Sequence, residues 1–114
     1  MKPRAKVITV GQVLNKLVKI NQEIRYKSCF DENTFSSGVI AFRPVGTSDR
    51  KQINHDDKDV VCQVLKGRGR LRVNGRRIEL RSGTICHIPK GTPNDFAAGK
   101  NGELVLFYSL IKTG

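Results

Sequence analysis

The feature that most constrains the fold is a series of short apolar runs that begins at residue 38. The runs are rich in Val, Ile, Leu and Phe, and Gly, Pro, Asn or Asp separates them at intervals of roughly eight to twelve residues. They read GVIAFRP, DVVCQVLKG, RLRVNG, RRIELRSG, TICHIPKG, NDFAA and ELVLFYSLI. Short strands at such even spacing are typical of an antiparallel sandwich or barrel, so we predict an all-β fold.

The dipeptide Asn74-Gly75 predicts a tight turn between two of these runs. Both residues tolerate the positive φ angles of a type I′ turn, whose twist matches that of two hairpin strands. The apolar side chains predicted to share the inward face of this hairpin are Leu71, Val73, Ile78 and Leu80.

Charge and cysteine content indicate which partners and which cellular compartment suit the chain. Twenty-one Lys and Arg against ten Asp and Glu give a formal charge of +11, which attracts a polyanion or an acidic protein surface. The three cysteines lack a CxxC spacing, which favours reduced thiols in a cytosol or nucleus. No apolar run approaches the roughly 18 to 20 residues that span a bilayer, and we expect no membrane contact.

Two stretches resemble the paired motifs of the cupin superfamily, whose fold is a small β-barrel. In metal-dependent cupins the second motif has the form G-x5-P-x-G-x2-H. Here Gly83, Pro89 and Gly91 fit that motif, and Asn94 stands where the histidine belongs. The resemblance therefore implies a small jelly-roll-like antiparallel barrel. We assign residues 36–114 to this barrel and residues 1–35 to an N-terminal covering arm, with a short strand and a short helix in 6–20.

Most positions that bind the metal in such cupins are lost. With the first motif aligned on Gly67, its ligand positions fall on Ile53, His55 and Val60. A divalent transition ion needs three or four converging N, O or S donors, and Ile and Val offer none. We therefore expect a degenerate cupin site at Ile53, His55, Val60 and Asn94, with no metal and no cofactor.

No set of catalytic residues stands out. Asp56, Asp57 and Asp59 share one stretch and lack the second, distant carboxylate that an acid–base pair needs. The glycines of GRGRLRVNG lead into a hairpin instead of a helix, so we interpret them as turn residues and exclude a phosphate-binding loop. We expect no enzymatic activity.

A narrower resemblance covers residues 36–112. VVCQVLKGRGRLRVNGRRIEL, SGTICHIPKGTPNDFAA and ELVLFYSLIKTG are similar to the C-terminal cupin-type domain of the centromere protein C family, which are inner-kinetochore scaffolds. The resemblance implies a homodimerisation domain at the C-terminal end of a longer protein, located in the nucleus at the centromere and acting in chromosome segregation. It also implies an acidic partner such as the assembly factor of the centromeric histone.

Two strands with apolar residues on both faces independently suggest a second subunit. A strand in a lone barrel needs an apolar inward face only, whereas DVVCQVLKG and ELVLFYSLI are apolar on both. The residues predicted for the dimer interface are Val61, Gln63, Leu65, Leu106 and Tyr108. The alternative is that residues 6–30 cover these surfaces within one chain.

Arginine is concentrated in the predicted hairpin. The residues predicted to contact a partner are Arg68, Arg70, Arg72, Arg76 and Arg77. Like charges across a hairpin are unfavourable, so this ribbon suggests an acidic protein or a DNA backbone. We favour the protein, because the arginine-bearing strands lack the aromatic residues on which single-stranded nucleic acid stacks. The alternative is an edge that charge protects against aggregation.

Three functions remain compatible with these patterns. The first is a non-catalytic homodimerisation and partner-docking module of a chromosomal scaffold. The second is a metal-free cupin enzyme, such as a sugar isomerase, and the third is the ligand-sensing domain of a transcription regulator.

Overall fold

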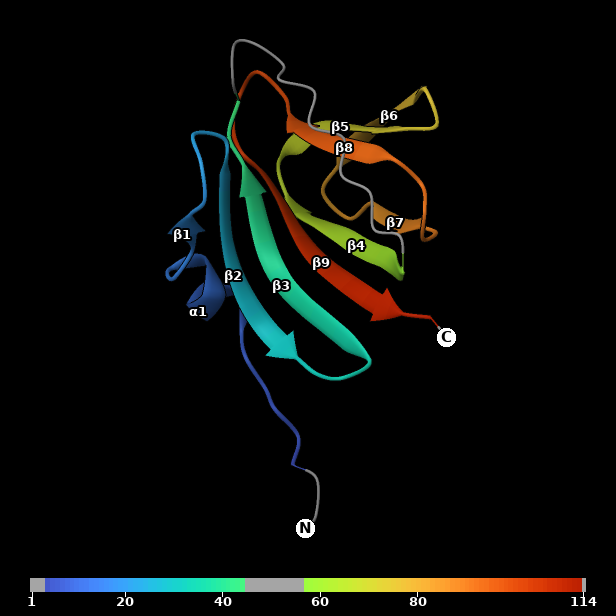
Figure 1. Ribbon diagram of the computed structural model, residues 1–114. Helices are drawn as coiled ribbons and strands as arrows, with labels where there is room; N and C mark the ends of the chain where they lie inside the picture. The colour runs from blue at the N-terminus through green and yellow to red at the C-terminus, as the bar shows by residue number, and fades with distance from the viewer. Residues whose placement is uncertain (1–3, 45–56, 114) are drawn as a thin grey trace.

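The computed structural model describes residues 4–44 and 57–113, and these contain nine strands and one short helix (Figure 1). The helix is α1 (Val10–Leu14). The strands are β1 (Val18–Lys19), β2 (Ile24–Asp31), β3 (Phe35–Phe42), β4 (Lys58–Lys66), β5 (Arg68–Val73), β6 (Arg76–Arg81), β7 (Ile85–Ile88), β8 (Asn94–Ala98) and β9 (Leu104–Lys112). None of the described helical segments has the length and apolar character that crossing a membrane requires.

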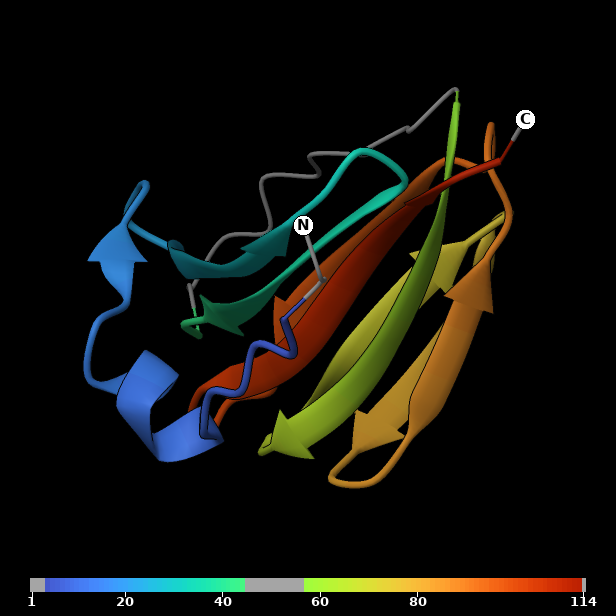
Figure 2. The same ribbon diagram turned by 90° about the horizontal axis from the view of Figure 1, so that it is seen from below.

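The strands form two sheets that face each other (Figures 1 and 2). The large sheet has the order β1-β2-β3-β9-β4-β7, and the small sheet has the order β6-β5-β8. Every pairing between the described strands is antiparallel. The predicted all-β, jelly-roll-like sandwich is therefore confirmed.

The main hydrophobic core lies between the two sheets. On β4, Val60, Cys62 and Val64 are each 1% exposed, because successive side chains of a strand alternate between its faces. The residues predicted for an interface on this strand, Val61, Gln63 and Leu65, accordingly lie on its other, outward face. The other buried members of the core are Phe42, Leu71, Leu80, Ile88, Phe96, Leu104 and Leu106.

A second, smaller core lies on the outer face of the large sheet, where α1 covers it. Val13 of the helix is 1% exposed and packs with Val39, Ala41 and Val105. Part of the outer face is thus covered within one chain. This agrees with the alternative interpretation, in which residues 6–30 cover the second apolar face in place of another subunit. Side chains partly buried against this cluster are Leu14, Leu17, Cys29, Leu65 and Phe107.

The N-terminal segment contributes more than a cover. Residues 18–31 supply β1 and β2, and β2 pairs with β3 along its length, so the predicted covering arm of residues 1–35 is limited to the chain before these strands. The predicted short helix is present, because Thr9 and Gln12 form a reciprocal capping box with hydrogen bonds of 3.0 and 3.2 Å. The strand predicted just before it is wrong: residues 4–9 form no strand.

The predicted hairpin is formed by β5 and β6. Asn74 and Gly75 have φ angles of 51° and 74°, as a type I′ turn requires. Leu71 lies directly opposite Ile78, so these side chains share the inward face. Gly69, which we interpreted as a turn residue, instead lies inside β5, where a Cβ would come within 2.2 Å of the Ala97 carbonyl oxygen.

Candidate functional sites in the barrel interior and on two outer faces

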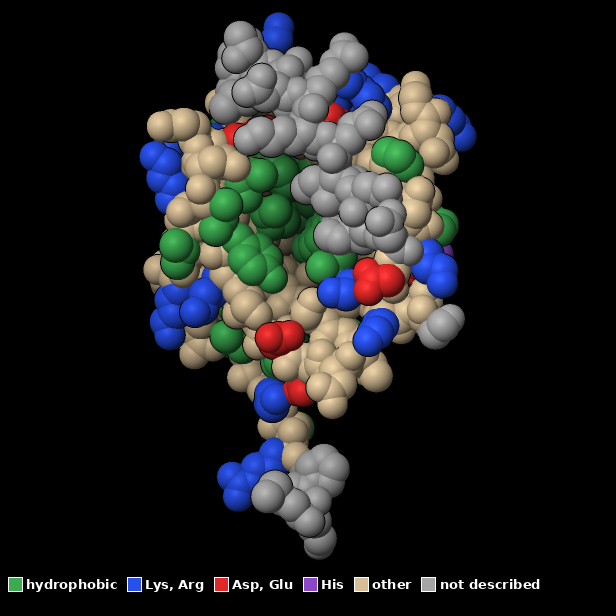
Figure 3. Space-filling view, viewed as in Figure 1, with side chains coloured by type: hydrophobic (Ala, Val, Ile, Leu, Met, Phe, Trp, Pro, Cys, Tyr) green, Lys and Arg blue, Asp and Glu red, His purple; other side chains and the backbone are tan. Residues whose placement is uncertain are grey.

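The interior of the barrel opens between the two sheets. Figure 3 shows this opening as a hollow with hydrophobic side chains gathered in its depth. Two residues of the predicted degenerate site are buried here, Val60 at 1% and Asn94 at 2% exposure. Ile53 and His55, the other two, lie outside the described residues.

Asn94 brings a polar group into this apolar interior. Its side-chain amide nitrogen donates to the Thr92 carbonyl oxygen at 3.0 Å. Its Oδ1 is buried and accepts no hydrogen bond from the described residues. A buried acceptor without a partner costs about 1–3 kcal/mol. The interior therefore offers one hydrogen-bond acceptor to a donor group.

The described residues do not fit the metal that many cupins bind. Val60 has no donor atom, and a neutral Asn amide is a poor ligand for a transition ion. Nowhere in residues 4–44 and 57–113 do three or more His, Cys, Asp or Glu side chains come together in a way that would hold a metal. The described part of the site therefore lacks the ligands that a transition ion needs.

Three polar side chains form a row across the inner face of the large sheet. Cys86 of β7 lies directly opposite Cys62 of β4, which lies opposite Tyr108 of β9. A hydrogen bond from the Cys62 thiol lowers the pKa of Cys86 to about 7, although burial opposes this shift. The same bond, followed by burial, raises the pKa of Cys62. Burial raises the pKa of Tyr108.

All three cysteines are free thiols, as predicted. The pairing of two of them was not foreseen, because it depends on the register between β4 and β7. The sequence spacing of 24 residues carries no signal of that register.

The predicted dimer-interface residues on β9 are wrong. Leu106 is 0% exposed in the main core, and Tyr108 lies on the same inward face, where its ring meets the Phe96 ring at a centroid distance of 6.2 Å. The outward side chains of β9 are Val105, Phe107, Ser109 and Ile111. Both faces of β9 are apolar, so alternation alone could not show which face points into the barrel. In the structure, Leu106 and Tyr108 face the main core, and Val105 and Phe107 face the side that α1 covers.

The remaining predicted interface residues lie on the outer face of β4. Gln63 is exposed, while Val61 and Leu65 are half-buried. Beyond the reach of α1, this outer face keeps further exposed apolar side chains: Ile85 is 71% exposed on β7, and Phe35 and Ile111, which face each other on β3 and β9, are 39% and 37% exposed.

The arginine hairpin has a more mixed character than its sequence indicates. Arg70 donates to Asp95 at 2.9 Å, and the two side chains are only 12% and 7% exposed. This ion pair links β5 to β8, and little of Arg70 is left accessible to a partner. Arg77 pairs with Glu79 at 2.9 Å in an exposed position. Arg68 and Arg76 are exposed, and Arg72 is half-buried.

An exposed histidine–carboxylate pair connects β4 and β7. His87 lies 2.9 Å from Asp59, whose other oxygen accepts from the Lys90 backbone at 2.9 Å. The hydrogen bonds from His87 and then Lys90 lower the pKa of Asp59. One oxygen of this carboxylate contacts His87 within β7 and the other orders the backbone after β7 at Lys90, so the pair has a structural role.

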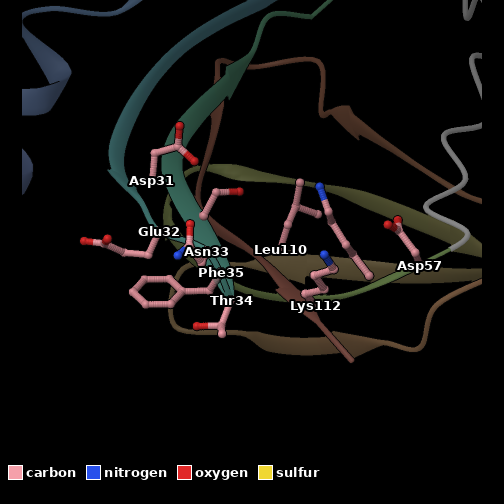
Figure 4. Close-up of a pocket in the computed structure, with 10 residues that line it drawn as sticks. Asp31, Glu32, Asn33, Thr34, Phe35, Asp57, Leu110 and Lys112 are labelled. Atoms are coloured by element: carbon pink, nitrogen blue, oxygen red, sulfur yellow. The ribbon is translucent and has the colours of Figure 1, made fainter. Parts of the chain in front are cut away.

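A polar hollow of about 200 Å³ lies at the β2–β3 turn (Figure 4). Its labelled acidic residues Asp31, Glu32 and Asp57 come from two segments, and Lys112 reaches it from β9. Pockets for small organic ligands usually measure about 300–1,000 Å³. The hollow is therefore too small and too mixed in charge for a main ligand site.

Comparison with known proteins places the chain in a family. The family model described as the AraC-like ligand binding domain matches residues 46–112, more than half of the 114 residues. The chain belongs to this family. A search of curated proteins finds no match to the chain.

Several solved structures share the fold of this AraC-like domain. The Cnp3 cupin domain of Schizosaccharomyces pombe is 18% identical with a TM-score of 0.73, over 84% of this chain and 69% of that one. KdgF from Halomonas sp. is 15% identical with a TM-score of 0.72, over 85% and 86%. A putative mannose-6-phosphate isomerase from Ralstonia eutropha is 10% identical with a TM-score of 0.74, over 97% and 100%. These similarities confirm the cupin-type fold.

Proposed function

We propose that the chain is a non-catalytic homodimerisation and partner-docking module of a chromosomal scaffold at the inner kinetochore. The observation that carries the proposal is a set of three apolar side chains left exposed on the outer face of the large sheet: Ile85, Phe35 and Ile111 are 71%, 39% and 37% exposed. Phe35 and Ile111 lie directly opposite each other on β3 and β9, and neighbouring exposed apolar side chains are typical of interaction sites. The resemblance of residues 36–112 to the dimerisation domain of centromere protein C gives the proposal its cellular setting.

The second copy of this chain is the occupant that fits this face best. The N-terminal segment that precedes α1 is also apolar and exposed, with Val7 at 89% and Ile8 at 40%. In Figure 1 this segment extends away from the two sheets. In a two-fold dimer, the outer face of one subunit and the N-terminal segment of the other would cover each other.

Light scattering of the purified protein at roughly ten micromolar and above tests this proposal. We expect the mass of a dimer. The double variant Ile85→Glu, Ile111→Glu should yield monomers, because it would bury unpaired carboxylates at the interface. Ile78→Glu is the matched control, since Ile78 is 38% exposed on the other sheet. A monomeric wild type, or a double variant that remains dimeric, would refute the proposed interface.

A second candidate function is ligand sensing inside the barrel. It is favoured by membership of the AraC-like ligand binding domains and by the unpartnered Oδ1 of buried Asn94. Native mass spectrometry of the purified protein tests it: a stoichiometric small molecule retained by wild type and lost in Asn94→Leu would favour sensing. Identical masses for the folded wild type and its calculated chain mass would count against it.

A further inference from the structure

The small sheet has a free edge at β6. β6 pairs with β5 on one side, and no described strand pairs with its other side. The hairpin turn of β5 and β6 projects at the upper right of Figure 1. Such an edge presents unpaired backbone N–H and C=O groups to which another strand can bind.

The two-residue turn determines which backbone groups of β6 are free. Val73 and Arg76 flank the turn and form its hydrogen-bonded pair, and such pairs alternate along an antiparallel ladder. The N–H and C=O groups of Arg77 and Glu79 therefore point away from β5. Arg81 closes this edge, because its backbone bonds to Thr84.

The outer face of the same edge has an unbalanced positive charge. Arg77 lies directly opposite Arg72, and Arg81 lies directly opposite Arg68. Like-charged pairs in this arrangement destabilise a sheet. Glu79 lies between the two arginines of β6 and pairs with Arg77 at 2.9 Å. No described carboxylate forms an ion pair with Arg68, Arg72 or Arg81.

The inner face of the edge is apolar and open to solvent at one position. Ile78 is 38% exposed, whereas its neighbour on the same face, Leu80, is 2% exposed. A hollow of about 380 Å³ lies beside Leu80 and is lined by Arg68, Glu79, Leu80 and Arg81. The edge therefore offers free backbone groups, cationic outer side chains and one uncovered apolar side chain.

We propose that the β6 edge binds an extended acidic segment of a partner protein as an added strand. The added strand would pair with Arg77 and Glu79, with an acidic side chain opposite Arg77, a neutral or basic one opposite Glu79 and an apolar one over Ile78. A further acidic side chain would reach the Arg81 guanidinium from beyond the paired stretch. Main-chain hydrogen bonds supply affinity in this mode of recognition, and alternate side chains supply specificity. The inference rests on the docking half of the proposed function and specifies the chemistry of the partner.

The alternation of charge favours a peptide over the other candidates. A nucleic-acid backbone carries negative charge at every phosphate, and Glu79 would repel it in the middle of the edge. A second copy of the chain would bring two arginine-rich faces together. A mixed peptide avoids both conflicts because each of its positions can match the side chain opposite.

A fluorescent nine-residue peptide of the form Glu-Val-Thr-Val-Glu-Val-Thr-Val-Glu is a suitable probe, with a scrambled peptide of the same composition as its control. We expect the alternating peptide to bind the wild-type chain more tightly than the scrambled one, and to bind less tightly as salt increases. Hydrogen exchange should show new protection of the Arg77 and Glu79 amides. Absence of binding, or binding without this protection, would overturn the proposal.

Charge-reversal variants test the role of the arginines. Arg77→Glu with Arg81→Glu should weaken peptide binding by roughly tenfold or more, because two charge-assisted contacts are lost. Lys16→Glu with Lys19→Glu is the matched control, since both lysines are exposed far from this edge. Equal losses in the two double variants would show only a general charge effect and would overturn the proposal.

The same variants separate this inference from its rivals. A duplex DNA that binds more tightly than the peptide, and more tightly still to Glu79→Arg, would replace the peptide with nucleic acid. Light scattering reports the dimer separately, and we expect Arg77→Glu with Arg81→Glu to leave its mass unchanged. A monomeric charge-reversal variant would show that β6 binds a second copy instead.

Discussion

At the scale of single residues, the paired thiols inside the barrel show how one side chain sets the chemistry of its neighbour. The hydrogen bond from Cys62 lowers the pKa of Cys86 to about 7. Because the thiolate is the nucleophile, we expect alkylation of Cys86 by iodoacetamide to reach half its maximal rate near pH 7 and to slow as the pH falls below that value. Peptide mass spectrometry of samples quenched at different pH values measures this.

Two comparisons make the thiol prediction specific. Burial raises the pKa of Cys29, so this thiol should become reactive only at a higher pH. Cys62→Ala removes the donated hydrogen bond, and the half-maximal pH of Cys86 should then rise. A Cys86 that titrates together with Cys29 in the wild type would contradict the assignment.

Individual residues were predictable where a motif fixed which face of their strand is buried. Both faces of β4 and of β9 are apolar, but the cupin-like motif places Val60 inside the barrel and so fixes the buried face of β4. Nothing does so for β9, and Leu106 and Tyr108 were assigned to the wrong face. The ion pair of Arg70 with Asp95 also escaped prediction, because it depends on the pairing of β5 with β8. Register between strands distant in sequence has no local signal.

At the scale of elements, Val13 is the one residue of α1 that is fully buried. Val13 is 1% exposed against the outer face of the large sheet. We expect Val13→Asp to release the helix from this face and to lower the free energy of unfolding by about 2 kcal/mol, the contribution of one buried valine. Chemical denaturation measures the energy, and hydrogen exchange measures loss of protection in residues 9–15.

The neighbouring residue Val10 supplies the control for this change. It is 44% exposed on the same helix, so Val10→Asp alters charge and helix propensity alike without removing the buried contact. We expect a loss well below that of Val13→Asp. Equal losses would mean that the helix owes its position to its capping box and not to packing.

The elements themselves were predictable to different degrees. Asn74-Gly75 located the hairpin because only a few residues suit its backbone angles. β2 was missed, because IRYKSCFD mixes polar and apolar side chains and contains a register shift between Ser28 and Phe30. A bulge of this kind breaks the alternation by which a strand is recognised.

At the scale of the whole molecule, the all-β fold was predictable from strand spacing and turn residues. The family model that matches residues 46–112 agrees with this prediction. Of the degenerate site, Val60 and Asn94 are buried in the described part of the chain. Ile53 and His55 lie outside it, so the site as a whole stays a prediction. Interaction surfaces were harder still to predict. The sequence shows that a strand has two apolar faces, but it does not show whether a helix of the same chain or another subunit covers the second face.

The last prediction concerns the N-terminal segment as part of the assembly. Val7 is 89% exposed, and in the proposed dimer this segment covers the outer face of the partner. Removal of residues 1–8 should leave the barrel folded, because α1 and its capping residue Thr9 remain, while dimer dissociation increases by roughly tenfold, equivalent to one buried apolar side chain. Unfolding temperatures at several protein concentrations measure this, since a dimer becomes more heat-stable as concentration rises. A truncated chain that keeps the concentration dependence of the wild type would show that the sheet faces alone hold the subunits together.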